Sequence, residues 1–414
     1  MPKSAKLGLL AVSVVVLLGL FLGVNFHGVH AASDGPQDGA YRQINVYREV
    51  LQHVQNDYVE DPNITKVTHG ALRGLLESLD ADSSYLNPDD YKAWKDAKQG
   101  KGQIGVVMSK RFGYATVVSV VPGSPADKAN LNDGDILEAI NGKDTRDISL
   151  AMIQLMMVGA PGSELKLGVL RPRSAKPEPI TVNRVVIVEP APSETAYENG
   201  SIVYLKPVVL DKDHVSAIEG KLKAASKQPG KKILLDLRDV ATGDMSEGVR
   251  LANFFVASGT LATLEGQKVA KQTFTAEASK AVNTKSPLVV LVNRGTAGAA
   301  ELAAAAIADS KRGELVGERT FGEGVQSKTF DMPDGGALIL SIAKYAAPDG
   351  KKFEDAGVTP ATLVSNDLSD DSVDDDAAPA KDAATKTAVK KKAPLVDAQL
   401  NKGLEMLKAK TAAA

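Results

Sequence analysis

The feature that most constrains the fold is a pair of nearly continuous apolar runs, each followed by a segment with helical spacing. The runs are KKILLDLRD, residues 231–239, and SPLVVLVN, residues 286–293. Such runs are typical of strands that are buried on both faces of a sheet. The helical segments are residues 245–259 and 300–310. Residues 201–360 therefore predict an α/β core in which helices pack on a sheet.

The turn between the second run and its helix carries no obvious nucleophile. It reads GTAGAAEL, residues 295–302, and its one hydroxyl belongs to Thr296. Turns from a strand into a helix are where α/β enzymes often hold a nucleophile or a phosphate. We interpret Thr296 as the N-cap of the following helix, with a nucleophilic role as the alternative. Ser310, at the far end of that helix, is expected to serve as a polar group at the helix C-terminus.

The N-terminus predicts an export segment. Two lysines precede the apolar stretch 7–24, whose length lies between that of a signal-peptide core and that of a membrane-spanning helix. Val29 and Ala31 are small enough to precede a signal-peptidase cleavage site. We therefore expect residues 1–31 to be a signal peptide, removed after Ala31, or a membrane anchor. A buried core helix is the alternative.

Two regions with different periodicity lie between this segment and the core. Residues 41–98 have the spacing of helices with a buried face, interrupted by the turn and capping signals DPN and NPDD. Residues 100–188 change to short strands with alternating apolar residues, a hairpin turn at residues 141–142 and a helix at residues 148–157.

Two further segments follow the core. Residues 361–393 contain an acidic block, an Ala/Lys spacer and a basic block, with too little apolar mass to fold, so we expect a disordered charged linker. Its acidic block lacks the glycine and the closing glutamate of a calcium-binding EF-hand. Residues 394–410 resume helical spacing with one apolar face, which we expect to dock on this protein or on a partner.

Composition narrows the possible functions. The chain has 414 residues, a formal net charge of −2 and no cysteine, which excludes disulfides and a thiol nucleophile and gives no basis for nucleic-acid binding. After residue 31, the histidines are His53, His69 and His214, which are widely separated and lack the spacing of metal ligands. We expect no metal and no cofactor.

The ordered set of motifs resembles the carboxyl-terminal processing peptidases, serine enzymes of bacterial envelopes and chloroplast lumens. LDADSSYL, residues 79–86, is similar to the family signature at the end of the helical region, and residues 100–188 are similar to its PDZ domain. Residues 233–239 and 288–324 follow the catalytic core in order, and residues 396–407 are similar to the closing helix. The resemblance implies a multidomain α+β protein of the bacterial cell envelope, periplasmic or membrane-anchored, with a helical N-terminal region, a PDZ domain and an α/β core like that of these peptidases.

The resemblance also implies a serine nucleophile and a lysine base, and this chain has neither. The family carries the serine in a segment of the form T-A-S-A-S-E and the lysine in T-F-G-K-G. The corresponding stretches here read TAGAAE and TFGEG, so Gly298 stands at the serine position and Glu323 at the lysine position. Glycine has no group that can attack a carbonyl. An ionised Glu323 would oppose an oxyanion rather than stabilise it.

The loop that supplies part of the oxyanion hole in the family also departs from the pattern. The family reads D-L-R-x-N-P-G-G, whereas residues 236–243 read DLRDVATG and retain the last glycine, Gly243. The chain then has one residue fewer than usual between Glu323 and Gln326. We therefore expect no intact catalytic set, with Gly298, Glu323, Gly243 and Gln326 as its degenerate positions.

The PDZ region retains a sequence that resembles a carboxylate-binding loop. Such domains hold the C-terminal carboxylate of a peptide on loop N–H groups and add the peptide as a strand beside a helix. Gly105 would let the backbone approach the ligand closely, and the methionines of residues 148–157 are expected to line an adaptable groove or to pack in the core. The predicted peptide-binding residues are Gln103, Ile104, Gly105, Val106, Ile153 and Met157.

These observations favour an exported, catalytically inactive PDZ protein that binds the C-terminal tails of envelope proteins as an adaptor or regulator. It is expected to form a homo-oligomer or to pair with an active relative, and to contact the membrane through its N-terminal segment. The alternatives are an active serine-type or atypical endopeptidase, for example one using a water activated by Glu323, and a structural envelope component that uses neither groove.

Overall fold

The computed structural model describes residues 36–97, 102–172, 174, 176–366 and 397–410. The chain divides into two compact units, residues 1–68 and 69–414. The predicted export segment, residues 1–31, and most of the predicted linker, residues 361–393, lie outside the described residues. Among the helices that are described, none is both long and apolar enough to cross a membrane.

The first unit contains helix α2, Pro36–Asp57, and the start of helix α3, Ile64–Glu77. We expected one face of α2 to be buried. This expectation is wrong within the unit, because Ile44 is 59% exposed and Val50 is 55% exposed. The described part of the unit holds only α2, a short connection and one turn of α3, which is too little chain to cover that face.

The end of the helical region joins a sheet of the core. Strand β1, Ser84–Leu86, pairs antiparallel with β16, Ala337–Ala346, and it was not predicted. Helix α4, Pro88–Asp96, follows, and the Asn87 side chain accepts a hydrogen bond of 3.0 Å from the Asp90 N–H, as the NPDD signal predicted.

The PDZ region forms its own sheet in the order β2-β3-β4-β6-β7, with β5 paired to β4. Strand β2 is therefore an edge strand among the described elements. The predicted hairpin turn is confirmed, with φ of 50° at Asn141 and 78° at Gly142. The elements are β2, Val106–Arg111; β3, Tyr114–Val120; α5, Pro125–Lys128; β4, Ile136–Ile140; β5, Lys143–Asp144; η1, Thr145–Asp147; α6, Leu150–Met157; β6, Glu164–Leu170; and β7, Glu178–Asn183.

The core sheet has the order β17-β14-β13-β10-β9-β8, in which β8 alone pairs antiparallel with its neighbour. The predicted alternation of strands and helices is confirmed. The elements are β8, Ser193–Tyr197; β9, Ile202–Lys206; α7, Lys212–Ser226; β10, Lys232–Asp236; α8, Met245–Phe255; β13, Leu288–Val292; α9, Ala299–Asp309; β14, Glu314–Gly317; β17, Thr362–Leu363; and α10, Ala398–Ala409.

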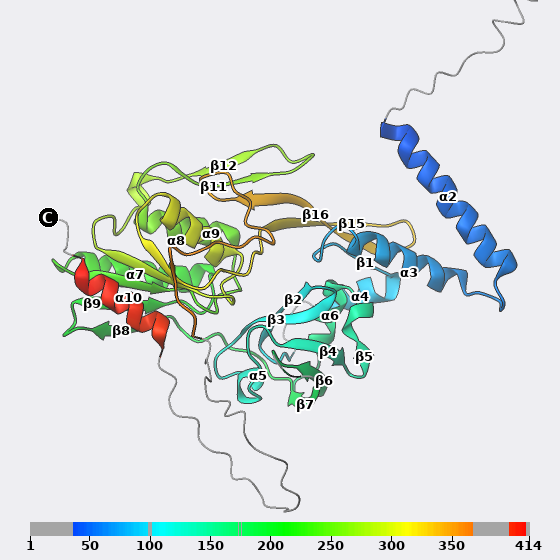
Figure 1. Cartoon of the computed structure of the whole chain (residues 1–414), viewed down its shortest axis with the longest axis horizontal. Helices are drawn as coiled ribbons and strands as arrows, with labels where there is room; N and C mark the ends of the chain where they lie inside the picture. The colour runs from blue at the N-terminus through cyan, green and yellow to red at the C-terminus, as the bar shows by residue number, and fades with distance from the viewer. Residues whose placement is uncertain (1–35, 98–101, 173, 175, 367–396, 411–414) are drawn as a thin grey trace, which may run out of the picture. The chain divides into compact units, whose positions relative to one another are not determined.

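Both faces of this sheet are buried, which explains the nearly continuous apolar runs. Ile233 and Leu235 pack with residues of α7, α8 and α9 on one face. Leu234 points to the other face and packs in a cluster with Leu407 of α10. Figure 1 shows α10, in red, lying against the strands of this sheet. Alternate residues of one strand thus serve two helical layers.

A second core sheet is antiparallel and has the order β1-β16-β11-β12, with β15 paired to β16. Its further elements are β11, Thr260–Glu265; β12, Gln272–Thr275; and β15, Val325–Asp331, with the short helix η2, Ala278–Lys280, after β12. Strand β15 begins directly after the TFGEG segment, so this sheet holds the end of that loop.

Helix α10 docks on the core of this protein, which is one of the two outcomes expected from the sequence. Its N-cap Asp397 accepts a hydrogen bond from Arg238, with 2.7 Å between Nη1 and Oδ1, and Arg238 also pairs with the buried Asp236. Gln399 is 1% exposed and donates to the Val364 carbonyl at 2.9 Å. The helix that closes the chain is thus held by apolar packing and by one buried ion-pair network.

We expect Leu407→Ala to lower the free energy of unfolding by about 2–5 kcal/mol, because it removes a fully buried side chain and leaves a cavity. Urea denaturation measures the change. The control is Asn401→Ala, which alters an exposed position of the same helix and is expected to be neutral or slightly stabilising. Equal, small effects of the two changes would contradict the docking of α10.

Candidate active site

The turn between β13 and α9 has the backbone geometry of a nucleophile elbow. Gly298 is the N-cap of α9 and has φ of 57° and ψ of −117°. These angles match the first central residue of a type II′ turn, which only glycine adopts without strain. In α/β hydrolases a sharp, strained turn of this kind exposes the nucleophile. The turn therefore has the backbone shape of a nucleophile elbow, but the residue at its tip, Gly298, has no side chain.

Thr296 does not cap α9, so the N-cap prediction for this residue is wrong. It is fully buried, and its hydroxyl donates to the Leu237 carbonyl at 2.9 Å and accepts from the Asn293 N–H at 3.0 Å. The hydroxyl instead ties the turn to the end of β10. At the other end of α9, Ser310 is the C-cap and donates to the Ile307 carbonyl, as predicted.

Glu301 joins the turn to the TFGEG loop. It is fully buried, and its carboxylate accepts from the N–H groups of Gly298 at 3.0 Å, Gly322 at 2.7 Å and Glu323 at 2.7 Å. The Thr320 hydroxyl donates to it as well. Burial raises the pKa of Glu301 to about 7, against the opposing effect of these hydrogen bonds.

The carboxyl group of Glu323 lies in an acidic environment. Burial raises its pKa to about 8, and the nearby charges of Asp82, Glu301 and Glu354 act in the same direction. Burial also raises the pKa values of Glu354 to about 7 and of Asp82 to about 6. The family resemblance implies one neutral lysine at this site. The structure instead places several carboxyl groups together, and the charge of each disfavours the ionisation of the others.

The segment that resembles the oxyanion loop is fixed by backbone contacts. Gly243 has φ of 156° and forms a β-bridge with Leu210, and a Cβ at Gly243 would lie 2.6 Å from the Leu210 carbonyl oxygen. The Ala297 N–H donates to the Val240 carbonyl at 3.0 Å. Gln326 is exposed at the start of β15.

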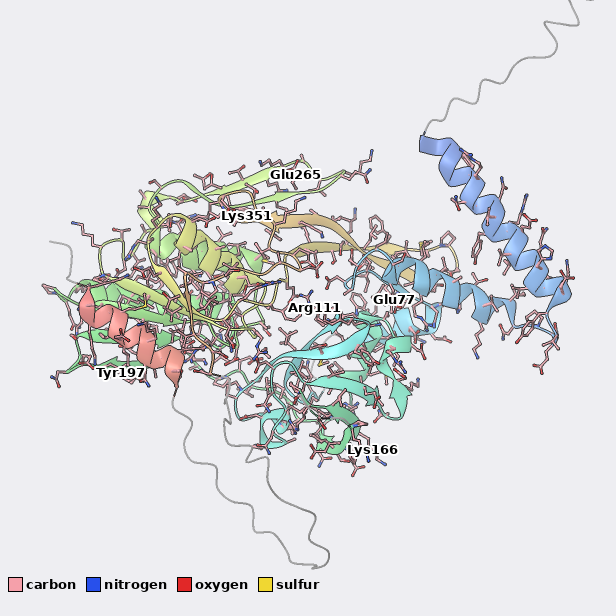
Figure 2. All side chains as sticks on the ribbon, viewed as in Figure 1. Glu77, Arg111, Lys166, Tyr197, Glu265 and Lys351 are labelled. Carbon is pink, nitrogen blue, oxygen red and sulfur yellow. The ribbon has the colours of Figure 1, made fainter. Side chains whose placement is uncertain are left out.

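An arginine of the PDZ strand β2 contacts the TFGEG loop. Arg111 donates to the carbonyl of Phe321 at 2.9 Å, pairs with Asp355 at 2.5 Å and stacks on the Phe321 ring at 4.3 Å. It is labelled in Figure 2. Arg111 is the nearby cation that favours the ionised form of Glu323. The PDZ sheet and the loop are thus linked by a charged side chain.

The predicted peptide-binding residues divide into a loop and a core group. Gly105 has φ of 82°, and a Cβ there would lie 2.3 Å from Cβ of Ser124. Ile104, Ile153 and Met157 are 0%, 0% and 5% exposed in the PDZ core. Their side chains pack in the core, so a direct contact with a peptide stays a prediction for them. Gln103 is exposed and bridges to Val185, and Val106 begins β2.

The histidines have ordinary structural partners, and no metal site is formed by the described residues. His53 pairs with Asp57, His214 pairs with Asp211, and the His69 ring lies 5.7 Å from the Tyr85 ring. Within the described ranges, no group of three His, Cys, Asp or Glu side chains is arranged to hold a metal ion.

Comparisons with known proteins agree with this architecture. Residues 203–364 match Peptidase family S41, and residues 94–170 match the PDZ domain. The chain is 29% identical over 318 residues to carboxyl-terminal-processing peptidase 2 of Arabidopsis thaliana chloroplasts, covering 73% of this chain and 61% of that protein. It is 28% identical to the carboxy-terminal-processing protease of Bartonella bacilliformis, covering 80% of this chain and 77% of that protein.

The fold matches that of a solved structure. The photosystem II D1 C-terminal processing protease superposes with a TM-score of 0.66 at 24% identity, covering 78% of this chain and 92% of that chain. The fold and the two family matches define a peptidase-like core joined to a PDZ domain. The chain is therefore similar to PDZ-containing carboxyl-terminal processing peptidases, with residues 203–364 resembling family S41 and residues 94–170 resembling a PDZ domain.

Two residues that organise the site were not singled out from the sequence. Glu301 stands three residues after the N-cap, the position from which a glutamate side chain reaches back to the N-cap N–H, and that spacing was a usable signal. Arg111 carried no signal, because its partners Phe321 and Asp355 lie more than 200 residues away in the chain.

We expect Gly298→Ala to lower the free energy of unfolding by about 1–3 kcal/mol, because the backbone conformation is strained for any residue with a Cβ. Crowding contributes little, since the nearest described atom to that Cβ is Met245 Cε at 3.9 Å. Urea denaturation measures the cost. The control is Gly220→Ala in α7, where the Cβ meets nothing and helix propensity favours alanine. A stabilising effect at Gly298 would contradict the strained geometry.

We expect Glu323→Gln to raise Tm at pH 9 and to change it little at pH 5. The folded protein holds this proton up to a pKa of about 8, whereas the unfolded chain loses it near 4.5. Stability from this group is therefore lost as pH rises through that window, and glutamine removes the loss. A gain on the order of 2–4 °C corresponds to about 1 kcal/mol in a domain of this size.

Differential scanning calorimetry at the two pH values checks this expectation. Glu265→Gln on β11 is the control, because it makes the same substitution at an exposed glutamate, which is labelled in Figure 2. Equal Tm shifts in both variants, or a lower Tm for Glu323→Gln at pH 9, would show that Glu323 is not held in an unfavourable environment.

Proposed function

We propose that the protein is an exported, non-cleaving relative of the carboxyl-terminal processing peptidases whose PDZ domain binds the C-terminal tails of envelope proteins, as an adaptor or regulator. The observation that carries the proposal is Gly298 at the elbow. The turn retains the shape that presents a nucleophile but has no atom to present. Loss of a nucleophile costs on the order of a millionfold in rate in serine proteases.

The surroundings of the turn support the absence of cleavage. The hydroxyl nearest in sequence, that of Thr296, is buried and engaged in two hydrogen bonds. A serine–lysine mechanism needs an amine as its base, and at that position Glu323 has a carboxyl group instead. Once ionised, that carboxyl would raise the energy of a developing oxyanion rather than lower it.

The PDZ region supports binding without catalysis. Strand β2 has one edge without a strand partner among the described elements, so a peptide can add to it by backbone hydrogen bonds. Gly105 lies at the start of this edge, in a conformation and a space that exclude a side chain. Assembly with a second copy or with an active relative is part of the same hypothesis, as is export through residues 1–31.

Binding of a short fluorescent peptide with a free, apolar C-terminus tests the proposal. We expect the free carboxylate to bind at least roughly tenfold more tightly than the C-terminal amide, because a charge-assisted hydrogen bond contributes about 1.5–3 kcal/mol. Fluorescence anisotropy gives both affinities, and mass spectrometry of the recovered peptide is expected to find it uncut.

Gly105→Ala and Gly113→Ala form a matched pair for the same assay. Both glycines have positive φ, of 82° and 84°, but only the Cβ at Gly105 would collide with Ser124. We expect binding to be lost in the first variant and kept in the second. Equal affinity for acid and amide peptides would refute tail recognition, and turnover that is abolished by Glu323→Gln would favour the atypical endopeptidase.

A further inference from the structure

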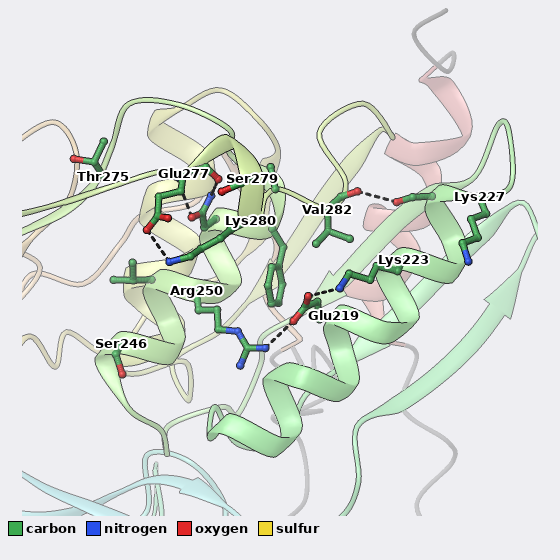
Figure 3. Close-up of a pocket in the computed structure, with 15 residues that line it drawn as sticks. Glu219, Lys223, Lys227, Ser246, Arg250, Thr275, Glu277, Ser279, Lys280 and Val282 are labelled. Atoms are coloured by element: carbon green, nitrogen blue, oxygen red, sulfur yellow. Dashed lines mark hydrogen bonds and ion pairs between the residues drawn. The ribbon is translucent and has the colours of Figure 1, made fainter.

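A hollow lies in the α/β core region, between α7, α8 and the segment 275–282 (Figure 3). Its volume is about 810 Å³, within the range of small-molecule pockets, roughly 300–1,000 Å³. None of its lining residues belongs to the Gly298 turn, the TFGEG loop or the segment that resembles the oxyanion loop. The proposed tail-binding function makes no use of this hollow.

The walls of the hollow are held together by polar contacts of Asn253 and Ser226. Asn253 of α8 is 4% exposed, and its side chain donates to the Glu277 carbonyl and accepts from the Glu277 N–H, both at 3.1 Å. Ser226 at the end of α7 donates to the Val282 carbonyl at 3.1 Å. These contacts tie the 275–282 segment to both helices, so the hollow is formed before any ligand arrives.

One side of the hollow carries a compensated charge cluster. Glu219 of α7 accepts from Arg250 at 2.7 Å and from Lys223 at 2.6 Å, and Figure 3 shows this carboxylate between its two cations. Arg250 also pairs with Glu247 at 3.1 Å. The cluster orients these side chains along the α7–α8 interface and leaves little net charge there.

The surplus charge of the hollow lies at Lys227. Lys280 pairs with Glu277 at 2.7 Å, whereas the ammonium group of Lys227 has no hydrogen bond or ion pair within the part of the chain that the structure describes. Val249, Val282 and the buried Phe254 form an apolar floor of the hollow, and Arg250 lies 5.5 Å from the centroid of the Phe254 ring. Figure 3 shows Lys227 at the end of α7, beside the hydrogen bond between Ser226 and Val282, so an ammonium group and an apolar floor border the same hollow.

Helix electrostatics explain only part of this arrangement. Lysines near the end of α7 interact favourably with the negative end of the helix dipole, which accounts for Lys223 and Lys227 as single residues. The dipole does not account for the hollow between the helices, nor for the third wall, which hydrogen bonds of Asn253 and Ser226 hold in place.

We propose that this hollow binds a small amphipathic anion, with its apolar body on Val249, Phe254 and Val282 and its carboxylate or phosphate group at Lys227. The site is independent of tail binding by the PDZ domain, because it shares no residue with that groove. The apolar floor supplies burial, and the unpaired ammonium supplies the selection for a negative charge.

Calorimetric titration of the purified full chain tests this proposal with three probes that share one body: 4-phenylbutyrate, 3-phenylpropyl phosphate and neutral 4-phenylbutanol. We expect one or both anions to bind at least roughly tenfold more tightly than the alcohol. The tighter anion identifies the head group. Binding of the alcohol as tight as that of both anions, or no binding of either anion, overturns the proposal.

Two lysine variants locate the site. Lys227→Gln is expected to weaken anion binding by about tenfold, as the loss of one charge-assisted contact does. Lys212→Gln, at the exposed first position of the same helix, is expected to leave it unchanged. Neither lysine holds another described element in place, so both variants are expected to fold. Equal binding to the two variants would place the anion elsewhere and refute the assignment.

Discussion

The Gly298 turn and the loop beside it depend on one buried carboxylate. Glu301 is fully buried and receives hydrogen bonds from the turn itself, from Thr320 and from the N–H groups of Gly322 and Glu323. A buried carboxylate without partners would be strongly destabilising, and these donors offset that cost. The contacts to residue 323 involve its backbone alone, so the loop keeps its place against the turn whichever side chain stands there.

Because residues 298 and 323 join this frame through their backbone N–H groups, a peptidase-like fold is compatible with glycine at position 298 and glutamate at position 323. The type II′ angles at Gly298 would strain a serine, and glycine adopts them freely. Glu323 has a destabilising effect when it ionises, because its negative charge then adds to the charges of Asp82, Glu301 and Glu354. Glycine at position 298 thus avoids backbone strain, whereas the carboxyl group of Glu323 keeps its proton up to a pKa of about 8 and destabilises the loop once it ionises.

Much of the core was predictable, because strands buried on both faces leave an unambiguous apolar pattern, as in residues 286–293. Strand β1 was missed, since three residues between capping signals carry no periodicity and their partner lies about 250 positions away. Thr296 fits the N-cap preference, but the tertiary bond to the Leu237 carbonyl decides its role. The face of α2 was expected to be buried from its spacing, and spacing alone cannot say what covers a helix. The residue types at the site could be read from the sequence. The hydrogen bonds around Glu301 and Arg111 could not, because their partners come together only when the chain folds.

We propose that no side chain of the 295–302 turn forms an acyl-enzyme. Intact-mass spectrometry of the wild-type protein, acid-quenched during incubation with an unfolded polypeptide, measures this directly. The account predicts one unmodified protein mass at every time point. A mass increase equal to a substrate fragment, mapped by peptide sequencing to a residue of the 295–302 turn, would contradict it.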